Sequence, residues 1–228
     1  MRNRHILGMA LAALAVTVLG ACASTETHQA VAAQQSVSAT SAAAYSGPRS
    51  ALIVGKFDNR SSYLRGMFSD GIDRLGGQAK TILMSHLQQT LRFDLMDRDN
   101  LEELAREAKL KGEAQTLQGA DYALTGDVTE FGRKVTGDQQ LFGILGAGKK
   151  QVAYSKVTIN VVEVKTSRVV FSVQGAGEYS LDSREVLGFG SDAGYDSTLN
   201  GKVLDLAVRE AVDRLVEGLE QGKWRPVR

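Results

Sequence analysis

The residue with the clearest chemical potential is Cys22, the only cysteine in the chain. Its thiol follows a basic start, Arg2 to His5, and a nearly continuous apolar run, Ile6 to Leu19. That run is too short to span a membrane and is typical of a secretory signal peptide. A secreted protein normally uses cysteines in pairs, so a single one needs another explanation. A lone cysteine excludes an intramolecular disulfide and a cysteine metal cluster.

Leu19-Gly20-Ala21-Cys22 resembles the lipobox of bacterial lipoproteins. The resemblance implies cleavage before Cys22 and acylation of its thiol and new amino group, with a fatty acid such as palmitate. Such chains would hold the protein on a membrane. Because Ala23 rather than Asp follows, the resemblance implies a lipid anchor in the outer membrane, with the main domain facing the periplasm. The alternative is an ordinary signal peptide followed by a chance cysteine.

A second segment, Gly143 to Lys149, fits the phosphate-cradling pattern G-x-x-x-x-G-K. Lys150 follows it, so the hydroxyl that would hold magnesium is missing, and the flanking sequence favours a glycine-rich hairpin tip. Other catalytic patterns, such as G-x-S-x-G and H-E-x-x-H, are absent from the sequence. We therefore expect no enzyme activity and no cofactor apart from the lipid on Cys22. With His28 and His86 as the only histidines after the signal segment, we expect no metal site, and a packing or hydrogen-bonding role for His86.

Charge excludes one class of partner. Loss of Arg2 and Arg4 with the signal peptide would change the formal net charge from +1 to −1. Nucleic-acid binding normally needs a strongly basic balance, so no nucleic-acid partner is expected.

Three parts are expected along the chain: residues 1–21 as the signal peptide, 22–47 as the lipidated N-terminus and a flexible tether, and 48–228 as one folded domain. The tether is rich in Ala, Ser, Thr and Gln, so it can bury too little apolar surface to offset the conformational entropy lost on folding. In the domain, hydrophobic periodicity and turn residues predict an α+β fold, a small sheet flanked by helices. The predicted strands are 50–57, 93–96, 119–128 and 152–164, and the predicted helices are 75–91, 101–110 and 200–222, the last with Asn200 as N-cap and Gly222 as stop. The broad apolar stripe of the last helix favours packing in the core, with a subunit contact as the alternative.

The segments Phe93 to Leu101 and Gly119 to Phe131, in this order after a lipobox, resemble the curli secretion lipoprotein family (the CsgG/HfaB type). The terminal Gly222-Lys223-Trp224 is similar to the closing segment of that family. The resemblance implies a periplasmic domain that assembles into a homo-oligomeric ring and exports unfolded fibre or adhesion subunits with accessory assembly proteins. It also implies a constriction in the loop Asp58 to Leu75, where the candidate residues are Asn59, Tyr63 and Phe68.

Channel-forming relatives add β-hairpins that join into one transmembrane β-barrel. The candidate hairpin regions are 128–164 and 169–199, but Asp182, Arg184 and Glu185 interrupt the faces of the second. Glycines such as Gly175 and Gly177 suit bends and turns there. The alternative to a channel is a periplasmic lipoprotein that binds and regulates a cell-envelope enzyme such as a peptidoglycan synthase.

Overall fold

The computed structural model describes residues 45–63, 72–139, 147–185 and 198–225. These residues belong to the second of two units of the chain, Gln34–Arg228, and the first unit, Met1–Ala33, lies outside them. The predictions for the signal peptide, Cys22, Phe68 and residues 143–146 therefore fall on residues that are not described.

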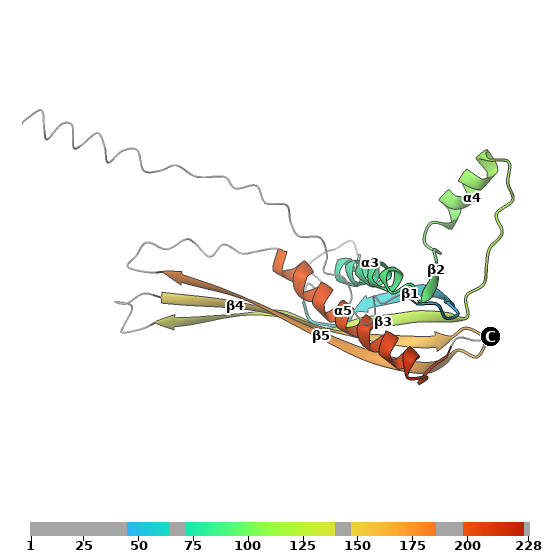
Figure 1. Cartoon of the computed structure of the whole chain (residues 1–228). Helices are drawn as coiled ribbons and strands as arrows, with labels where there is room; N and C mark the ends of the chain where they lie inside the picture. Colours follow the sequence, from blue (N-terminus) through green and yellow to red (C-terminus); the bar gives the residue numbers. More distant parts are fainter. Residues whose placement is uncertain (1–44, 64–71, 140–146, 186–197, 226–228) are drawn as a thin grey trace, which may run out of the picture. The chain divides into compact units, whose positions relative to one another are not determined.

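A five-stranded sheet in the order β2-β1-β3-β4-β5 organises the domain (Figure 1). Strand β1 (Ser50–Asn59) runs parallel to β2 (Phe93–Met96) and to β3 (Tyr122–Gln139). Strands β4 (Ala147–Glu163) and β5 (Arg168–Glu185) complete the sheet in antiparallel pairing. The predicted fold class, a small sheet flanked by helices, is confirmed. Strand β3 continues to Gln139, well beyond the predicted end at residue 128, and β5 lies largely within the region predicted as the second candidate hairpin, 169–199.

Two helices cover one face of this sheet. Helix α3 (Arg74–Gln89) packs on β1, helix α5 (Thr198–Glu220) packs on β4 and β5, and the helices contact each other. Most of the α5 stripe is buried in the same core as the sheet, which confirms core packing. His86 of α3 is also buried, and its Nε2 lies 2.9 Å from Oδ1 of Asp205 on α5, so this polar contact joins the two helices.

Helix α5 starts two residues earlier than predicted, so Asn200 lies inside the helix and the prediction of an N-cap there is wrong. Its end agrees with the prediction. Gly222 has a φ of 69° and donates its N–H to the Leu219 carbonyl at 3.0 Å, which closes the last turn. The chain then places Trp224 in an aromatic cluster, with ring centroids 6.0 Å from Phe93 and 5.5 Å from Tyr122.

Close approach of α5 to β5 depends on two glycines. A Cβ atom at Gly175 would lie 2.1 Å from the Ala207 carbonyl oxygen, and one at Gly177 would lie 2.6 Å from the Val203 carbonyl oxygen. Both distances are shorter than a carbon–oxygen contact of about 3.3 Å. Gly175 and Gly177 therefore seat α5 on a continuous strand, and the prediction that they mark bends or turns is wrong.

The other face of the sheet is polar. Ser172 on β5 donates its hydroxyl to Oδ1 of Asn160 on β4 at 2.7 Å, and Thr129 on β3 bonds the Lys156 carbonyl at 3.3 Å. In β4 every second residue from Val152 to Val162 is only partly buried, whereas the residues between them are buried. This period of two is typical of a sheet with one covered and one open face.

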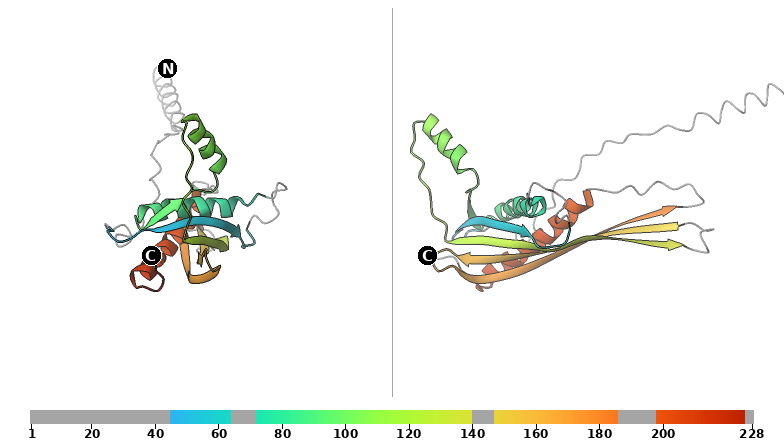
Figure 2. Two further views of the ribbon diagram at one scale, coloured as in Figure 1. Left: turned by 90° about the vertical axis from the view of Figure 1, so that its right-hand side faces the viewer. Right: turned by 180° about the vertical axis from the view of Figure 1, so that it is seen from behind.

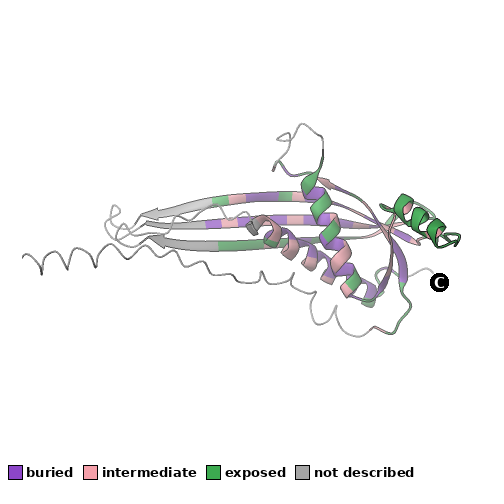
Figure 3. Ribbon diagram, turned by 90° about the horizontal axis from the view of Figure 1, so that it is seen from above, coloured by how far each residue is buried: buried purple, intermediate pink, exposed green. Residues whose placement is uncertain are grey.

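Helix α4 (Leu101–Leu110) is the least covered element of the described chain, since none of its residues is buried. Leu104 and Leu110 are 43% and 76% exposed. Figures 1 and 3 show the helix standing away from the sheet, with most of its surface exposed. Asn100 is the N-cap residue of α4 but makes no side-chain cap hydrogen bond, and its Nδ2 donates to Oδ2 of Asp97 at 2.7 Å.

Strands β3, β4 and β5 continue beyond the end of β1 as a three-stranded ribbon (Figures 1 and 2). Its members are Glu130–Gln139, Ala147–Lys156 and Ala176–Glu185, paired without interruption. Among the described helices, none combines the length and the apolar character needed to cross a membrane.

Candidate functional site

The end of β1 and the start of α3 frame the predicted constriction loop. Asp73, the N-cap of α3, accepts hydrogen bonds from the Asn59 N–H through Oδ2 and from the Gly76 N–H through Oδ1, the latter at 2.8 Å. A Cβ atom at Gly76 would lie 2.4 Å from the Phe57 carbonyl oxygen, so glycine is needed where helix and strand meet. One carboxylate thus holds both ends of this loop together.

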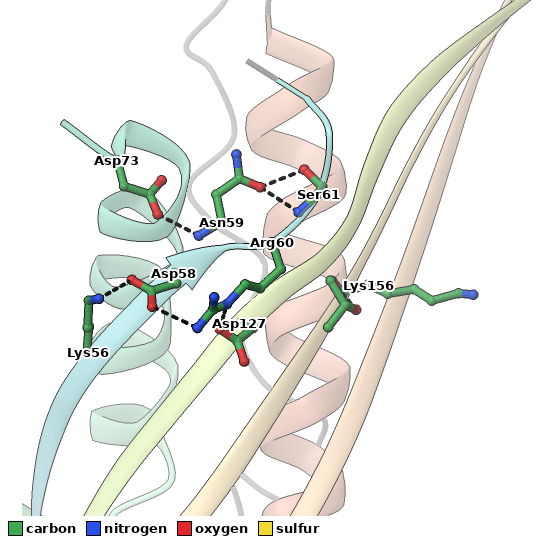
Figure 4. Close-up of polar contacts among 9 residues, drawn as sticks. Lys56, Asp58, Asn59, Arg60, Ser61, Asp73, Asp127 and Lys156 are labelled. Atoms are coloured by element: carbon green, nitrogen blue, oxygen red, sulfur yellow. Dashed lines mark hydrogen bonds and ion pairs between the residues drawn. The ribbon is translucent and has the colours of Figure 1, made fainter. Parts of the chain in front are cut away.

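Asn59 shapes the chain that leaves β1 (Figure 4). Its Oδ1 accepts hydrogen bonds from the Ser61 N–H at 3.0 Å and from the Ser61 hydroxyl at 2.6 Å. Its Nδ2 donates to the Tyr63 carbonyl at 2.8 Å. The side-chain amide of Asn59 is therefore engaged within the loop, where it fixes a tight turn.

Tyr63 lies between β3 and α5. Its ring packs against Phe131 with a centroid distance of 4.7 Å, and its hydroxyl accepts a hydrogen bond from Nδ2 of Asn200 at 2.8 Å. Oδ1 of Asn200 in turn accepts a hydrogen bond from Nε of Arg133 at 2.9 Å. Three elements that are distant in the sequence meet here, and their contacts position the predicted loop at the base of the ribbon.

A chain of ion pairs runs along the end of β1 (Figure 4). Asp58 lies 3.1 Å from Lys56 and 3.3 Å from Arg60, and Arg60 lies 3.1 Å from Asp127 on β3. The hydrogen bond and charge of Asp127 raise the already high pKa of Arg60, which therefore stays charged. Glu130 and Lys156 form a further pair at 2.9 Å across β3 and β4. This arrangement makes a charged surface at the base of the ribbon.

The outer edge of β5 is covered by α5 only at its base. Arg214 donates to the Gln174 carbonyl at 2.8 Å, and Glu210 accepts the Ala176 N–H at 2.6 Å. The two side chains also pair with each other at 2.6 Å. Beyond Ala176 the strand continues for nine residues as the outermost strand of the described sheet.

The structure brings together two of the sequence-predicted site residues, Asn59 and Tyr63, whereas Phe68 and Cys22 lie outside the described residues. The sequence did not predict that Asn200 and Arg133 position this loop, because their contacts join residues that are distant in the chain. Glu210 and Arg214 are four residues apart on a helix, and this spacing predicts that they pair with each other. The spacing does not predict that both also bond to the edge of β5.

A family model and a close relative both match this chain over most of its length. The family model described as curli production assembly/transport component CsgG matches residues 32–227. A protein of Neisseria meningitidis serogroup B, named provisionally as a lipoprotein, is 56% identical over 218 residues, which cover 96% of each chain.

Solved structures match at lower sequence identity. The PelC dodecamer from Paraburkholderia phytofirmans is 18% identical and matches over 74% of this chain and 93% of that chain, with a TM-score of 0.34. Lipoprotein GNA1162 from Neisseria meningitidis is 17% identical over 75% of this chain and 99% of that chain, with a TM-score of 0.37. The LpoB C-terminal domain from Salmonella enterica is 16% identical over 57% of this chain and 85% of that domain, with a TM-score of 0.31.

The family match covers nearly the whole folded domain, including the segments on which the sequence resemblance rested. That resemblance is therefore confirmed, and this chain belongs to the CsgG family of curli production assembly/transport components.

Proposed function

We propose that this protein is a subunit of a ring-shaped export component at the outer membrane, anchored through lipid on Cys22. The ring would export unfolded fibre or adhesion subunits and would catalyse no reaction. Accessory assembly proteins would act with it as partners. Membership in the curli assembly/transport family supports the general role, and the name of the Neisseria meningitidis relative supports the lipid anchor.

The observation that carries the ring is the ribbon of β3, β4 and β5. Beyond Val128, β3 has no partner on its outer side among the described strands, and β5 is the sheet edge on the opposite side. Long open edges normally invite pairing with another chain, and proteins block them where pairing is unwanted. The β5 edge is blocked by Arg214 and Glu210 only up to Ala176. In the proposed ring, β5 of one subunit pairs with β3 of the next.

Ribbon length suits the wall of a pore. From Glu130 to Gln139 the strand β3 has ten residues beyond the pairing with β1, which matches the roughly nine to eleven residues of a membrane-spanning strand. Near the base, Nζ of Lys134 lies 5.6 Å from the ring centroid of Tyr154, and Lys156 pairs with Glu130. This charged face of the ribbon base would line the water-filled side of the proposed wall.

Size analysis of the mature protein, extracted from outer membranes in mild detergent, tests the proposal. Native mass spectrometry is expected to give one closed oligomer with a fixed number of subunits. Single subunits at every protein concentration would contradict the ring and would favour the alternative, a tethered module that regulates an envelope enzyme.

The anchor has a separate test. In Cys22→Ser the acylated thiol is absent, and the protein is expected in the soluble periplasmic fraction, whereas the wild-type chain stays with outer membranes. A Cys22→Ser protein that remains in the membrane fraction after a high-salt wash would argue against acylation as the anchor. Mass spectrometry of the wild-type N-terminal peptide provides the direct control, since acylation adds the mass of the lipid to Cys22.

A further inference from the structure

We propose that a basic cavity at the start of β5 binds the carboxylate end of a peptide chain whose last side chain is apolar. The inference rests on the proposed function, in which this domain handles unfolded polypeptides, and it names a chemical group by which the domain would hold them. The cavity has a volume of about 500 Å³, which is within the usual range of small-ligand sites. We call it the basic cavity.

The basic cavity lies where the turn between β4 and β5 meets the segment that follows α5. Ser167, with a φ of 57°, donates its N–H to the Glu163 carbonyl at 2.8 Å, which closes the turn and sets Arg168 as the first residue of β5. The hydroxyl of Tyr122, at the start of β3, donates to the Arg225 carbonyl and so fixes the segment after α5 beside the sheet. Side chains from three strands and from the end of α5 therefore surround one space.

Positive charge dominates the lining. Arg168, Lys223 and Arg225 face one carboxylate, that of Glu163, among the residues that line the cavity. Glu163 is already engaged, because it accepts the hydroxyl of Thr166 in the turn. None of the three cations forms an ion pair with a carboxylate of the described residues. A guanidinium group presents parallel N–H donors that match the two oxygens of a carboxylate, so the lining fits an anionic ligand.

Apolar side chains form the other part of the lining. Val169, 54% exposed, lines the cavity together with Val170 and Trp224. The indole N–H of Trp224 donates to the Leu215 carbonyl at 3.3 Å, so the Trp224 ring offers apolar contact to a ligand. A matching ligand therefore carries an apolar group directly beside its anionic group. The last residue of a peptide chain has this form when its side chain is apolar, and capture of a terminal carboxylate is a recurring mode of peptide recognition.

The place of the basic cavity in the fold favours a peptide over a lipid head group. Tyr122 lines the cavity, and the ribbon starts eight positions later in β3, at Glu130 (Figure 1). Eight residues of strand span about 26 Å, which is about three Debye lengths at physiological ionic strength. In the proposed function the ribbon lies in the membrane, so lipid phosphates are out of electrostatic reach. A polypeptide that awaits export reaches this end of the sheet from the periplasm.

Trp224 reports on the site, because it is the only tryptophan in the chain. The full-length protein in mild detergent is titrated with an acetylated tetrapeptide that ends in leucine and with the same peptide amidated at its C-terminus. The free acid is expected to change the Trp224 fluorescence to saturation, and the amide to bind at least about tenfold more weakly. Equal affinities, or an acid that gives neither a fluorescence change nor a binding heat, would overturn the proposal. Inorganic phosphate that binds as tightly as the acid would also overturn it.

Charge removal provides a second test. Arg168→Gln with Lys223→Gln is expected to raise the Kd of the free acid about tenfold or more, through lost charged hydrogen bonds, and to leave the Kd of the amide unchanged. Lys165→Gln is the matched control, because Lys165 is exposed in the same turn but does not line the cavity. It is expected to bind like wild type. Lys223→Gln alone, with a Tm equal to that of wild type, is expected to show a smaller loss in the same direction. A folded double variant that binds the acid as tightly as wild type would overturn the proposal.

The outcomes separate this inference from the proposed function, because peptide binding is measured whether or not subunits assemble. Wild-type rings that do not discriminate between acid and amide would overturn the carboxylate site and leave the ring in place. Single subunits that bind the acid through Arg168 and Lys223 would support the site and contradict the ring. Single subunits without this binding would overturn both.

Discussion

Replacement of Gly175 by alanine should separate α5 from the sheet. The new Cβ would lie 2.1 Å from the Ala207 carbonyl oxygen and 2.5 Å from the Ala211 nitrogen. Relief to an ordinary carbon–oxygen distance of about 3.3 Å requires a shift of about 1.2 Å. Both neighbouring atoms belong to the backbone of α5, so no side-chain rotation can absorb this shift.

The loss of stability in Gly175→Ala can be estimated from the apolar residues that α5 buries. Eight apolar residues of the helix are fully buried: Val203, Leu204, Ala207, Val208, Ala211, Val212, Leu215 and Val216. A gap of 0.5–1 Å already removes about a quarter to a half of the dispersion energy of such contacts. Overpacking of this kind typically costs about 1–3 kcal/mol. We expect a loss near the upper end, about 3 kcal/mol, which corresponds to a fall of about 6–12 °C in Tm for a domain of this size.

Thermal unfolding followed by circular dichroism measures this change, with wild type and variant at equal protein concentration. Gly119→Ala is the matched control, because no atom lies within 4 Å of its added Cβ. It is expected to leave Tm unchanged or to raise it slightly, since alanine restricts the unfolded chain. A Gly175→Ala protein that unfolds within about 1 °C of wild type would refute the close packing of α5 on β5.

Two further substitutions test the polar contacts of the core. Arg92→Met removes a nearly buried guanidinium that donates to Glu220 and, at 2.8 Å, to the Thr90 carbonyl. Denaturant unfolding should show that the free energy of unfolding falls by about 1–3 kcal/mol. An unchanged unfolding midpoint would contradict this role of Arg92. Burial, and then the charge of Glu163, raises the pKa of Tyr122. Its contribution to stability is therefore complete below about pH 10 and lost at higher pH. Tyr122→Phe should remove one tyrosine from the phase of an ultraviolet tyrosinate titration that lies above about pH 10, and an unchanged amplitude of that phase would contradict the assignment.

Local patterns were sufficient to predict most helices and strands. The α3 stripe and the short strand Phe93–Met96 were predicted close to their observed bounds, because their signals lie in three- and four-residue spacing and in flanking turn residues. The predictions failed at residues whose structural role depends on a segment that is distant in the sequence. Asn200 has the side chain of an N-cap, but contacts with Tyr63 and Arg133 use it inside α5. Glycine is common at bends, but Gly175 and Gly177 lie in a continuous strand because only glycine leaves room there for the backbone of α5.

The candidate site was only partly predictable. The segment around Asn59 and Tyr63 was found through the family resemblance, whereas its attachment to Asp73 and Asn200 required the three-dimensional structure. The ribbon strands lie inside the two regions predicted as candidate hairpins, 128–164 and 169–199, but their bounds and register were not predicted, because strand pairing depends on the neighbouring strands.

Cryo-electron microscopy of the mature protein in mild detergent tests the central claim most directly. The predicted result is a closed ring with a continuous β-wall, in which β5 of each subunit pairs, beyond Ala176, with β3 of the next subunit. Rings whose subunits touch only through helices, with both ribbon edges open, would contradict the account, and so would particles of single subunits.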